Sequence, residues 1–81
     1  MTQAEAIAKL QIIFDRLFVE PPALRPGMTA KEVPDWDSLK HVELLMAIEK
    51  ELGISFSLGE MVSTQNVDAL AGAVAQHAGT R

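Results

Sequence analysis

The chain has 81 residues, a formal net charge of −4 and no cysteine. A chain of this length folds as one domain, 1–81, with a modest core and little room for a deep active-site cleft. The lack of cysteine excludes disulfides, thiolate metal ligands and a cysteine nucleophile. No apolar run approaches the ~20 residues that span a bilayer, and no secretory leader is apparent, so we expect a cytoplasmic protein without a membrane partner.

The negative charge is concentrated in the middle of the chain. Residues 32–60 hold seven acidic and two basic side chains, for a net charge of −5, whereas the remainder carries +1. This distribution argues against nucleic acid and anionic membranes as partners. It suits a basic protein surface, and an ordinary solvated acidic face is the alternative.

The first predicted element is a helix over residues 3–18. Residues 2–5, TQAE, fit a capping box, and apolar side chains then recur at intervals of three and four. A pair of prolines ends this helix. Residues 20–37, which contain four prolines, form a long loop, and we expect Met28 and Val33 to anchor it in the core.

A second helix is expected to begin at Asp37 or Ser38 and to end near Gly53, a residue suited to the position after a helix. At about 100° per residue, four large apolar side chains share one arc of this helix. His41 falls in the same arc, where a histidine is more often packed than reactive. The expected core face consists of Leu44, Leu45, Ile48 and Leu52.

Two more helices complete the prediction. Residues 57–60, SLGE, form another capping box and open a short helix through about Val62. Asn66 caps a last helix that should fray after His77 and stop at Gly79. No strand alternation is visible, so the predicted fold is all-α, a four-helix bundle with three longer helices and one short helix. The inward residues of the last helix should be Val67, Leu70, Ala71 and Val74.

Ser38 has three interpretations. As a helix cap it competes with Asp37, and capping by Asp37 would leave the serine hydroxyl available. Together with His41 and Asp35, Ser38 resembles the parts of a hydrolase triad, but the sequence has no G-x-S-x-G elbow and no glycine-rich oxyanion segment, so we expect no catalytic residue. The third interpretation is covalent modification, because a phosphate ester on Ser38 would lie at a helix N-terminus, which favours anions.

The strongest pattern is Asp37-Ser38-Leu39 followed by VELLMAIEKELGI at residues 42–54. This pattern closely resembles the acyl carrier protein family, whose hallmark is D-S-L before an apolar and acidic helix. Helix order, the long first loop and the short third helix also match, so the resemblance covers nearly the whole chain. It implies a four-helix fold and a 4′-phosphopantetheine group that a phosphopantetheinyl transferase attaches to Ser38 from coenzyme A. Acyl groups would be held as thioesters, by a carrier with no catalysis and no metal site of its own.

The resemblance also suggests roles for residues near Ser38. The family's matching aspartate lies close to the metal–phosphate site of the transferase complex, so Asp37 is a supporting residue for attachment as well as a cap. Leu39, Glu43 and Met46 are the candidate docking residues for basic partner enzymes that load or process acyl groups, because apolar contact and charge would act together there. Core packing is the alternative for Leu39 and Met46. We expect the chain to be a monomer.

The pattern departs from the family in front of Ser38. Asp35 stands where glycine is common, and Trp36 stands where a small or aliphatic residue is frequent. With these departures, and with Lys40 and His41 after Ser38, the sequence resembles carriers of specialised pathways more than the housekeeping fatty-acid carrier.

The cargo stays open, with a peptidyl or aminoacyl carrier and an unmodified helical interaction module as alternatives to an acyl carrier. His41 near the opening of the bundle could favour a polar cargo or could simply be packed. Four residues near that opening could instead shelter an acyl chain: Val42, Leu45, Phe56 and Met61.

Overall fold

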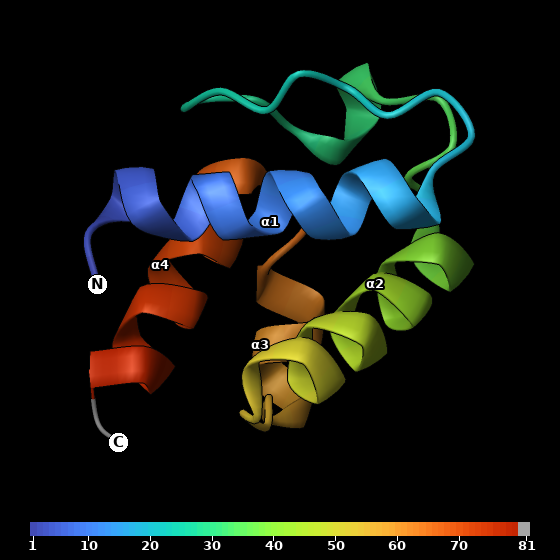
Figure 1. Ribbon diagram of the computed structural model, residues 1–81. Helices are drawn as coiled ribbons and strands as arrows, with labels where there is room; N and C mark the ends of the chain where they lie inside the picture. Colours follow the sequence, from blue (N-terminus) through green and yellow to red (C-terminus); the bar gives the residue numbers. More distant parts are fainter. Residues whose placement is uncertain (80–81) are drawn as a thin grey trace.

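The computed structural model describes residues 1–79. This part of the chain contains four α-helices and one 3₁₀ turn, and the predicted all-α bundle is confirmed (Figure 1). The α3 helix is the short one. The elements, in chain order, are α1 (Gln3–Leu17), the turn η1 (Ala30–Glu32), α2 (Ser38–Leu52), α3 (Leu58–Ser63) and α4 (Val67–Gly79).

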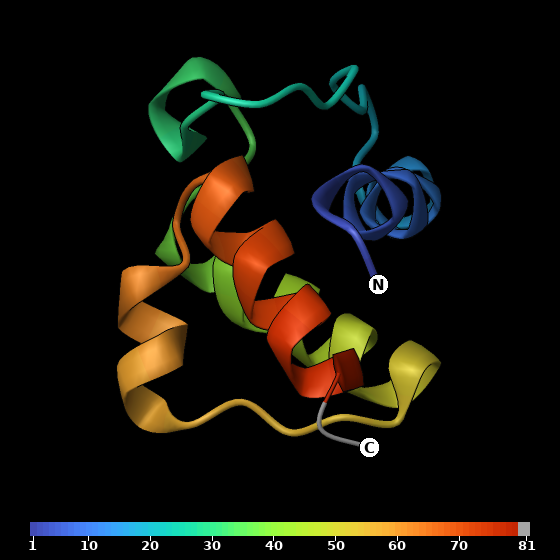
Figure 2. The same ribbon diagram turned by 90° about the vertical axis from the view of Figure 1, so that its left-hand side faces the viewer.

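The helices pack around one hydrophobic core. Helix α1 lies against both α2 and α4, and α3 packs beside α2 (Figures 1 and 2). The long loop crosses the bundle above α1 and returns to the start of α2, which lies near the C-terminal end of α1 (Figure 1). None of the described helices combines the length and the apolar character needed to cross a bilayer.

The predicted helix starts are confirmed by their caps. At the start of α1, the Thr2 N–H donates to the Glu5 carboxylate and the Glu5 N–H donates to the Thr2 hydroxyl, with nitrogen-to-oxygen distances of 2.8 and 3.1 Å. Asn66 Oδ1 accepts the Ala69 N–H at 2.7 Å and caps α4. These caps pair backbone N–H groups that a helix start otherwise leaves unsatisfied.

The predicted helix ends agree within a residue. Phe18 is the C-cap of α1, one residue beyond Leu17. Gly53 ends α2 with φ 66°, a left-handed conformation that glycine adopts at little cost. Helix α4 reaches Gly79, the predicted end, and residues 78 and 79 are still helical. Residues 80–81 lie outside the described residues.

The long loop is held in place by its own buried side chains and by a side chain of α1. Met28 and Val33 are buried, which confirms both as anchors. Gln11 of α1 accepts the Leu24 N–H at 2.8 Å and donates to the carbonyl of Pro22 at 2.8 Å. These bonds satisfy loop backbone groups, so the segment in front of Ser38 follows a defined path.

The expected core faces are largely confirmed. Leu44, Leu45 and Ile48 of α2 are fully buried, whereas Leu52, at the last turn, is only partly buried at the edge of the core. The four residues expected to point inward from α4 are all buried.

Candidate functional site

Ser38 is the first residue of α2, and its side chain is exposed. The helix cap comes from Asp37, whose Oδ1 accepts the Lys40 N–H at 2.8 Å. The Asp37 carbonyl also accepts the His41 N–H at 2.8 Å, which is the first bond of the helix. Because Asp37 provides the cap, the Ser38 hydroxyl is not needed for it. The hydroxyl therefore lies at a solvent-accessible helix N-terminus, where the helix dipole favours an attached phosphate by about 0.3–1 kcal/mol.

His41 is buried, with 2% of its surface exposed, and both ring nitrogens are hydrogen-bonded. The Trp36 indole N–H donates to His41 Nδ1 at 2.9 Å, and His41 Nε2 lies 3.1 Å from Thr64 Oγ1. A histidine paired in this way is not available as a base for Ser38. Among residues 1–79, no group of three or more potential ligand side chains is placed to hold a metal ion.

The hydrogen-bond roles in this network follow from chemistry. The indole nitrogen of Trp36 can only donate, so Nδ1 of His41 accepts and its proton resides on Nε2. Nε2 then donates to Thr64 Oγ1, and the Thr64 hydroxyl donates to the Glu60 carbonyl at 2.5 Å. Burial lowers the pKa of His41, and a hydrogen bond with the Met61 backbone offsets part of this effect. We call Trp36, His41 and Thr64 the Trp–His–Thr network.

Trp36 also belongs to an aromatic cluster on the α1 side. Its ring meets Phe14 edge to face, with centroids 5.2 Å apart and planes at 82°. Phe14 stacks on Phe18 with centroids 4.8 Å apart. Lys40 Nζ lies 5.8 Å from the centroid of the Phe18 ring. Trp36 is thus held in the core by Phe14 on one side and by His41 on the other.

The candidate docking residues lie on the surface of α2. Leu39 is 71% exposed and Met46 is 60% exposed, so the alternative interpretation, that both residues pack in the core, is wrong. Glu43 is also exposed, but its Oε2 lies 3.4 Å from Lys40 Nζ. The pairing offsets part of the acidic charge that the sequence suggested for a basic partner.

The four residues that could shelter an acyl chain differ in burial. Val42 is 45% exposed and Met61 is partly buried, but Leu45 and Phe56 are in the core. Whether these four residues could shelter an acyl chain stays a prediction, since burial alone does not test it.

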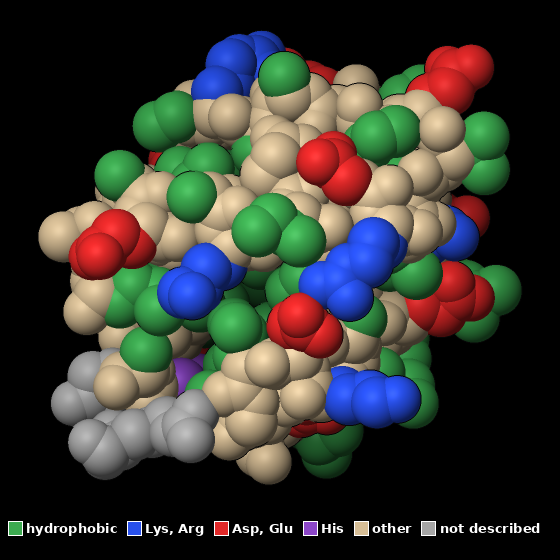
Figure 3. All heavy atoms as spheres, viewed as in Figure 1, with side chains coloured by type: hydrophobic (Ala, Val, Ile, Leu, Met, Phe, Trp, Pro, Cys, Tyr) green, Lys and Arg blue, Asp and Glu red, His purple; other side chains and the backbone are tan. Residues whose placement is uncertain are grey.

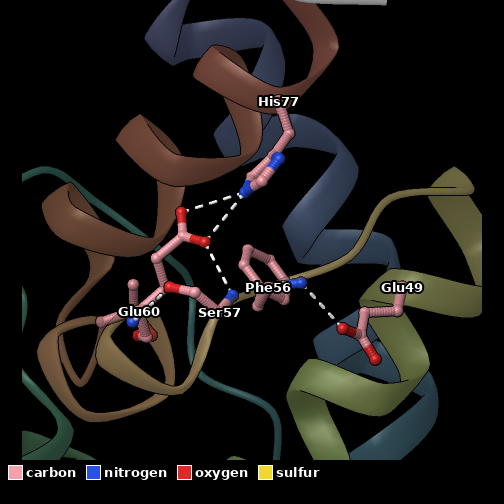
Figure 4. A network of polar contacts seen from close by, with 6 residues as sticks. Glu49, Phe56, Ser57, Glu60 and His77 are labelled. Atoms are coloured by element: carbon pink, nitrogen blue, oxygen red, sulfur yellow. Dashed lines mark hydrogen bonds and ion pairs between the residues drawn. The ribbon is translucent and has the colours of Figure 1, made fainter.

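The connection between α2 and α3 is held from three helices (Figure 4). Glu49 of α2 accepts the Phe56 N–H at 2.8 Å, which gives a role to an acid that the helical pattern did not explain. Glu60 of α3 accepts the Ser57 N–H at 2.9 Å and lies 2.9 Å from His77 Nε2. The backbone hydrogen bond from Ser57 is the main cause that lowers the pKa of Glu60, with His77 adding to it.

An open groove lies between α1 and α2, on the face shown in Figure 3. Its volume is about 260 Å³, and it combines apolar and charged side chains. The α2 residue of the groove nearest to Ser38 along the chain is Ala47. Nine residues of helix correspond to roughly 13 Å, so the groove does not open beside Ser38. It is lined by Ile13, Arg16, Leu17, Ala47, Lys50 and Glu51.

Comparison with known proteins identifies the kind of site. The family model described as "Phosphopantetheine attachment site" matches residues 36–74. The chain is similar to the acyl carrier protein of Thermosynechococcus vestitus, with 40% identity over 55 residues, which cover 67% of this chain and 68% of that protein. Its fold is similar to the solution NMR structure of holo acyl carrier protein from Geobacter metallireducens, with a TM-score of 0.84 and 30% identity over 93% of this chain and 87% of that one.

The fold and the matched segment define a carrier protein with a covalently attached 4′-phosphopantetheine group. The residues present fit such a group, because an exposed serine hydroxyl at the start of α2 can form a phosphate ester. With the coverage and identity given above, the chain belongs to the acyl carrier protein family.

Proposed function

We propose that Ser38 is the attachment residue and that the chain presents acyl groups to partner enzymes without catalysing a reaction itself. The strongest support comes from the start of α2, where Asp37 caps the helix and Ser38 is exposed, so its hydroxyl is not needed for the cap. A modified cap residue would lose a stabilising bond, whereas modification of Ser38 leaves the cap intact.

The chemistry at Ser38 is the formation of one phosphoester bond. The Ser38 oxygen bonds to the phosphorus of coenzyme A that bears the pantetheine part, and the bond from this phosphorus to the nucleotide phosphate breaks. The nucleotide leaves as adenosine 3′,5′-bisphosphate, which takes up the proton that Ser38 loses. The bound group supplies a terminal thiol that holds cargo as a thioester, which suits a chain that contains no cysteine. The protein's own residues position the attachment point and keep it accessible to the transferase.

Asp37 is proposed to support attachment as well as to cap α2. Asparagine caps helices about as well as aspartate, so Asp37→Asn removes the charge and keeps the cap. We expect this variant to melt at nearly the same temperature and to be modified more slowly. If this variant melts at a lower temperature and is modified at the normal rate, Asp37 acts only as a cap.

The proposed partners are a phosphopantetheinyl transferase and the enzymes that load or process the acyl group. Leu39 and Met46 offer exposed apolar contacts beside the charge of Glu43, and such a surface suits a basic docking site. We further propose that the chain works as a monomer in the cytoplasm, where these enzymes can reach Ser38.

The test is modification in vitro. The protein is incubated with coenzyme A and a phosphopantetheinyl transferase, and its intact mass is measured. We expect wild type and Ser63→Ala, a control at another exposed serine, to gain one phosphopantetheine, and Ser38→Ala to gain none. Equal modification of Ser38→Ala would refute the proposal.

A further inference from the structure

The two sides of α2 beneath Ser38 are closed in different ways. An acyl chain that starts from an arm on Ser38 could enter the core beside the first turn of α2, toward either α1 or α3. Toward α1, the space holds the rings of Phe14, Phe18 and Trp36. Because the stacked and edge-to-face contacts join these rings, insertion there requires the displacement of large buried side chains.

Toward α3, the Trp–His–Thr network occupies the interface. His41 lies one helical turn after Ser38, and Thr64 is the C-cap of α3. Trp36, His41 and Thr64 are 4%, 2% and 2% exposed. Each hydrogen bond runs in one direction, from the indole through the imidazole to the hydroxyl and on to the Glu60 carbonyl. No side-chain nitrogen or oxygen that is buried within residues 1–79 lacks a partner.

We propose that the Trp–His–Thr network closes the bundle beneath Ser38, so that this carrier keeps its cargo outside the core and serves short or polar acyl groups. The inference rests on the proposed attachment at Ser38. The class of cargo would then be determined by Trp36 in the loop, His41 in α2 and Thr64 at the end of α3.

The physical reason is that a hydrocarbon chain cannot replace the hydrogen bonds that it would break. A methylene chain that separated α2 from α3 would pull His41 away from Thr64 or Trp36, and it would offer no donor or acceptor in return. Buried polar groups without partners are more costly than the net gain from a typical hydrogen bond. A short or polar acyl group has few methylenes to bury, so it gains little from the core and loses nothing by staying outside.

The test compares three loaded forms of the whole protein: acetyl, octanoyl and tetradecanoyl. Intact mass first confirms that each form is loaded at Ser38. The melting temperature and the hydrogen exchange of the Trp36 indole N–H are then measured. We expect the same melting temperature for all three wild-type forms, and an indole N–H that stays equally protected with every chain.

A variant with an apolar network provides the contrast. Trp36→Phe, His41→Leu and Thr64→Val together remove the polar groups of the network and keep apolar side chains in their place, although Phe is smaller than Trp. In this triple variant we expect the melting temperature to rise by several degrees from acetyl to tetradecanoyl, because the chain can now enter without breaking buried hydrogen bonds. If the triple variant does not fold, the two wild-type measurements still decide the matter.

Two results would overturn the inference alone. One is a wild-type melting temperature that rises with chain length, whether the chain lies between the helices or in the groove at Ala47. The other is a folded triple variant without any dependence on chain length. A chain that is not modified at Ser38 would overturn both this inference and the proposed function, and the mass measurement reveals that case before any melting curve is recorded.

Discussion

Trp36→Phe is the substitution that isolates the hydrogen bond to His41. It removes the indole N–H and keeps an aromatic ring against Phe14. His41 Nδ1 then becomes a buried acceptor without a partner, at a cost of about 1–3 kcal/mol. In a domain of this size, each kcal/mol shifts the melting temperature by about 4–8 °C, so we expect a fall of roughly 4–24 °C. Thermal unfolding followed by circular dichroism measures it.

A double-mutant cycle separates this bond from packing losses. His41→Leu alone leaves the Trp36 N–H unpaired, whereas the double variant with Trp36→Phe leaves neither group unpaired. The double variant should therefore lose about 0.5–3 kcal/mol less than the sum of the single losses. Trp36→Phe combined with Thr2→Ala is the control, and it should be additive because Thr2 pairs with Glu5 at the start of α1, outside this hydrogen-bond chain. Additive losses for Trp36 and His41 would refute the reasoning.

Three more outcomes follow from the described contacts. Ser57→Ala should cost about 0.5–2 kcal/mol in urea unfolding because it removes the N-cap of α3, whereas Ser38→Ala should cost little; equal losses would contradict the assignment of the caps. Burial lowers the pKa of His41 below its ordinary value of 6.5, so the unfolded chain binds this proton first. Stability should therefore fall as the pH drops through about 6.5 toward the folded-state pKa, and His41→Leu should lack this part of the decline in urea unfolding at several pH values. Glu43→Lys should slow association with the transferase in stopped-flow experiments, more at low salt than at high salt, whereas the same charge change in Glu20→Lys, on the loop after α1, should have little effect.

Local sequence rules predicted the elements well, and they also predicted the place of Ser38 at the start of α2. The patterns that start α1 and α3 specify reciprocal hydrogen bonds within four residues, and Gly53 specifies a left-handed end for α2. The position of Ser38 after a better cap, Asp37, is equally local. Such features depend on neighbours along the chain, so they can be read without the fold.

The Trp–His–Thr network could not be predicted in this way. His41 and Thr64 are 23 residues apart, and they meet only because α3 packs beside α2. The place of His41 in an apolar arc indicated burial, but nothing local identified Thr64 as its partner. Glu49 is a similar case, because its acceptor oxygen meets the Phe56 N–H only after the chain turns at Gly53.

The central claim is that Ser38 carries the phosphopantetheine arm. The most direct measurement is fragment mass mapping of the protein isolated from its native host, under conditions that preserve thioesters. We expect one added phosphopantetheine on the peptide that contains Ser38 and, in the loaded fraction, a short or polar acyl group on that arm. An unmodified chain, or an arm on any other serine, would contradict the account and would favour a helical interaction module that keeps the carrier fold without the arm.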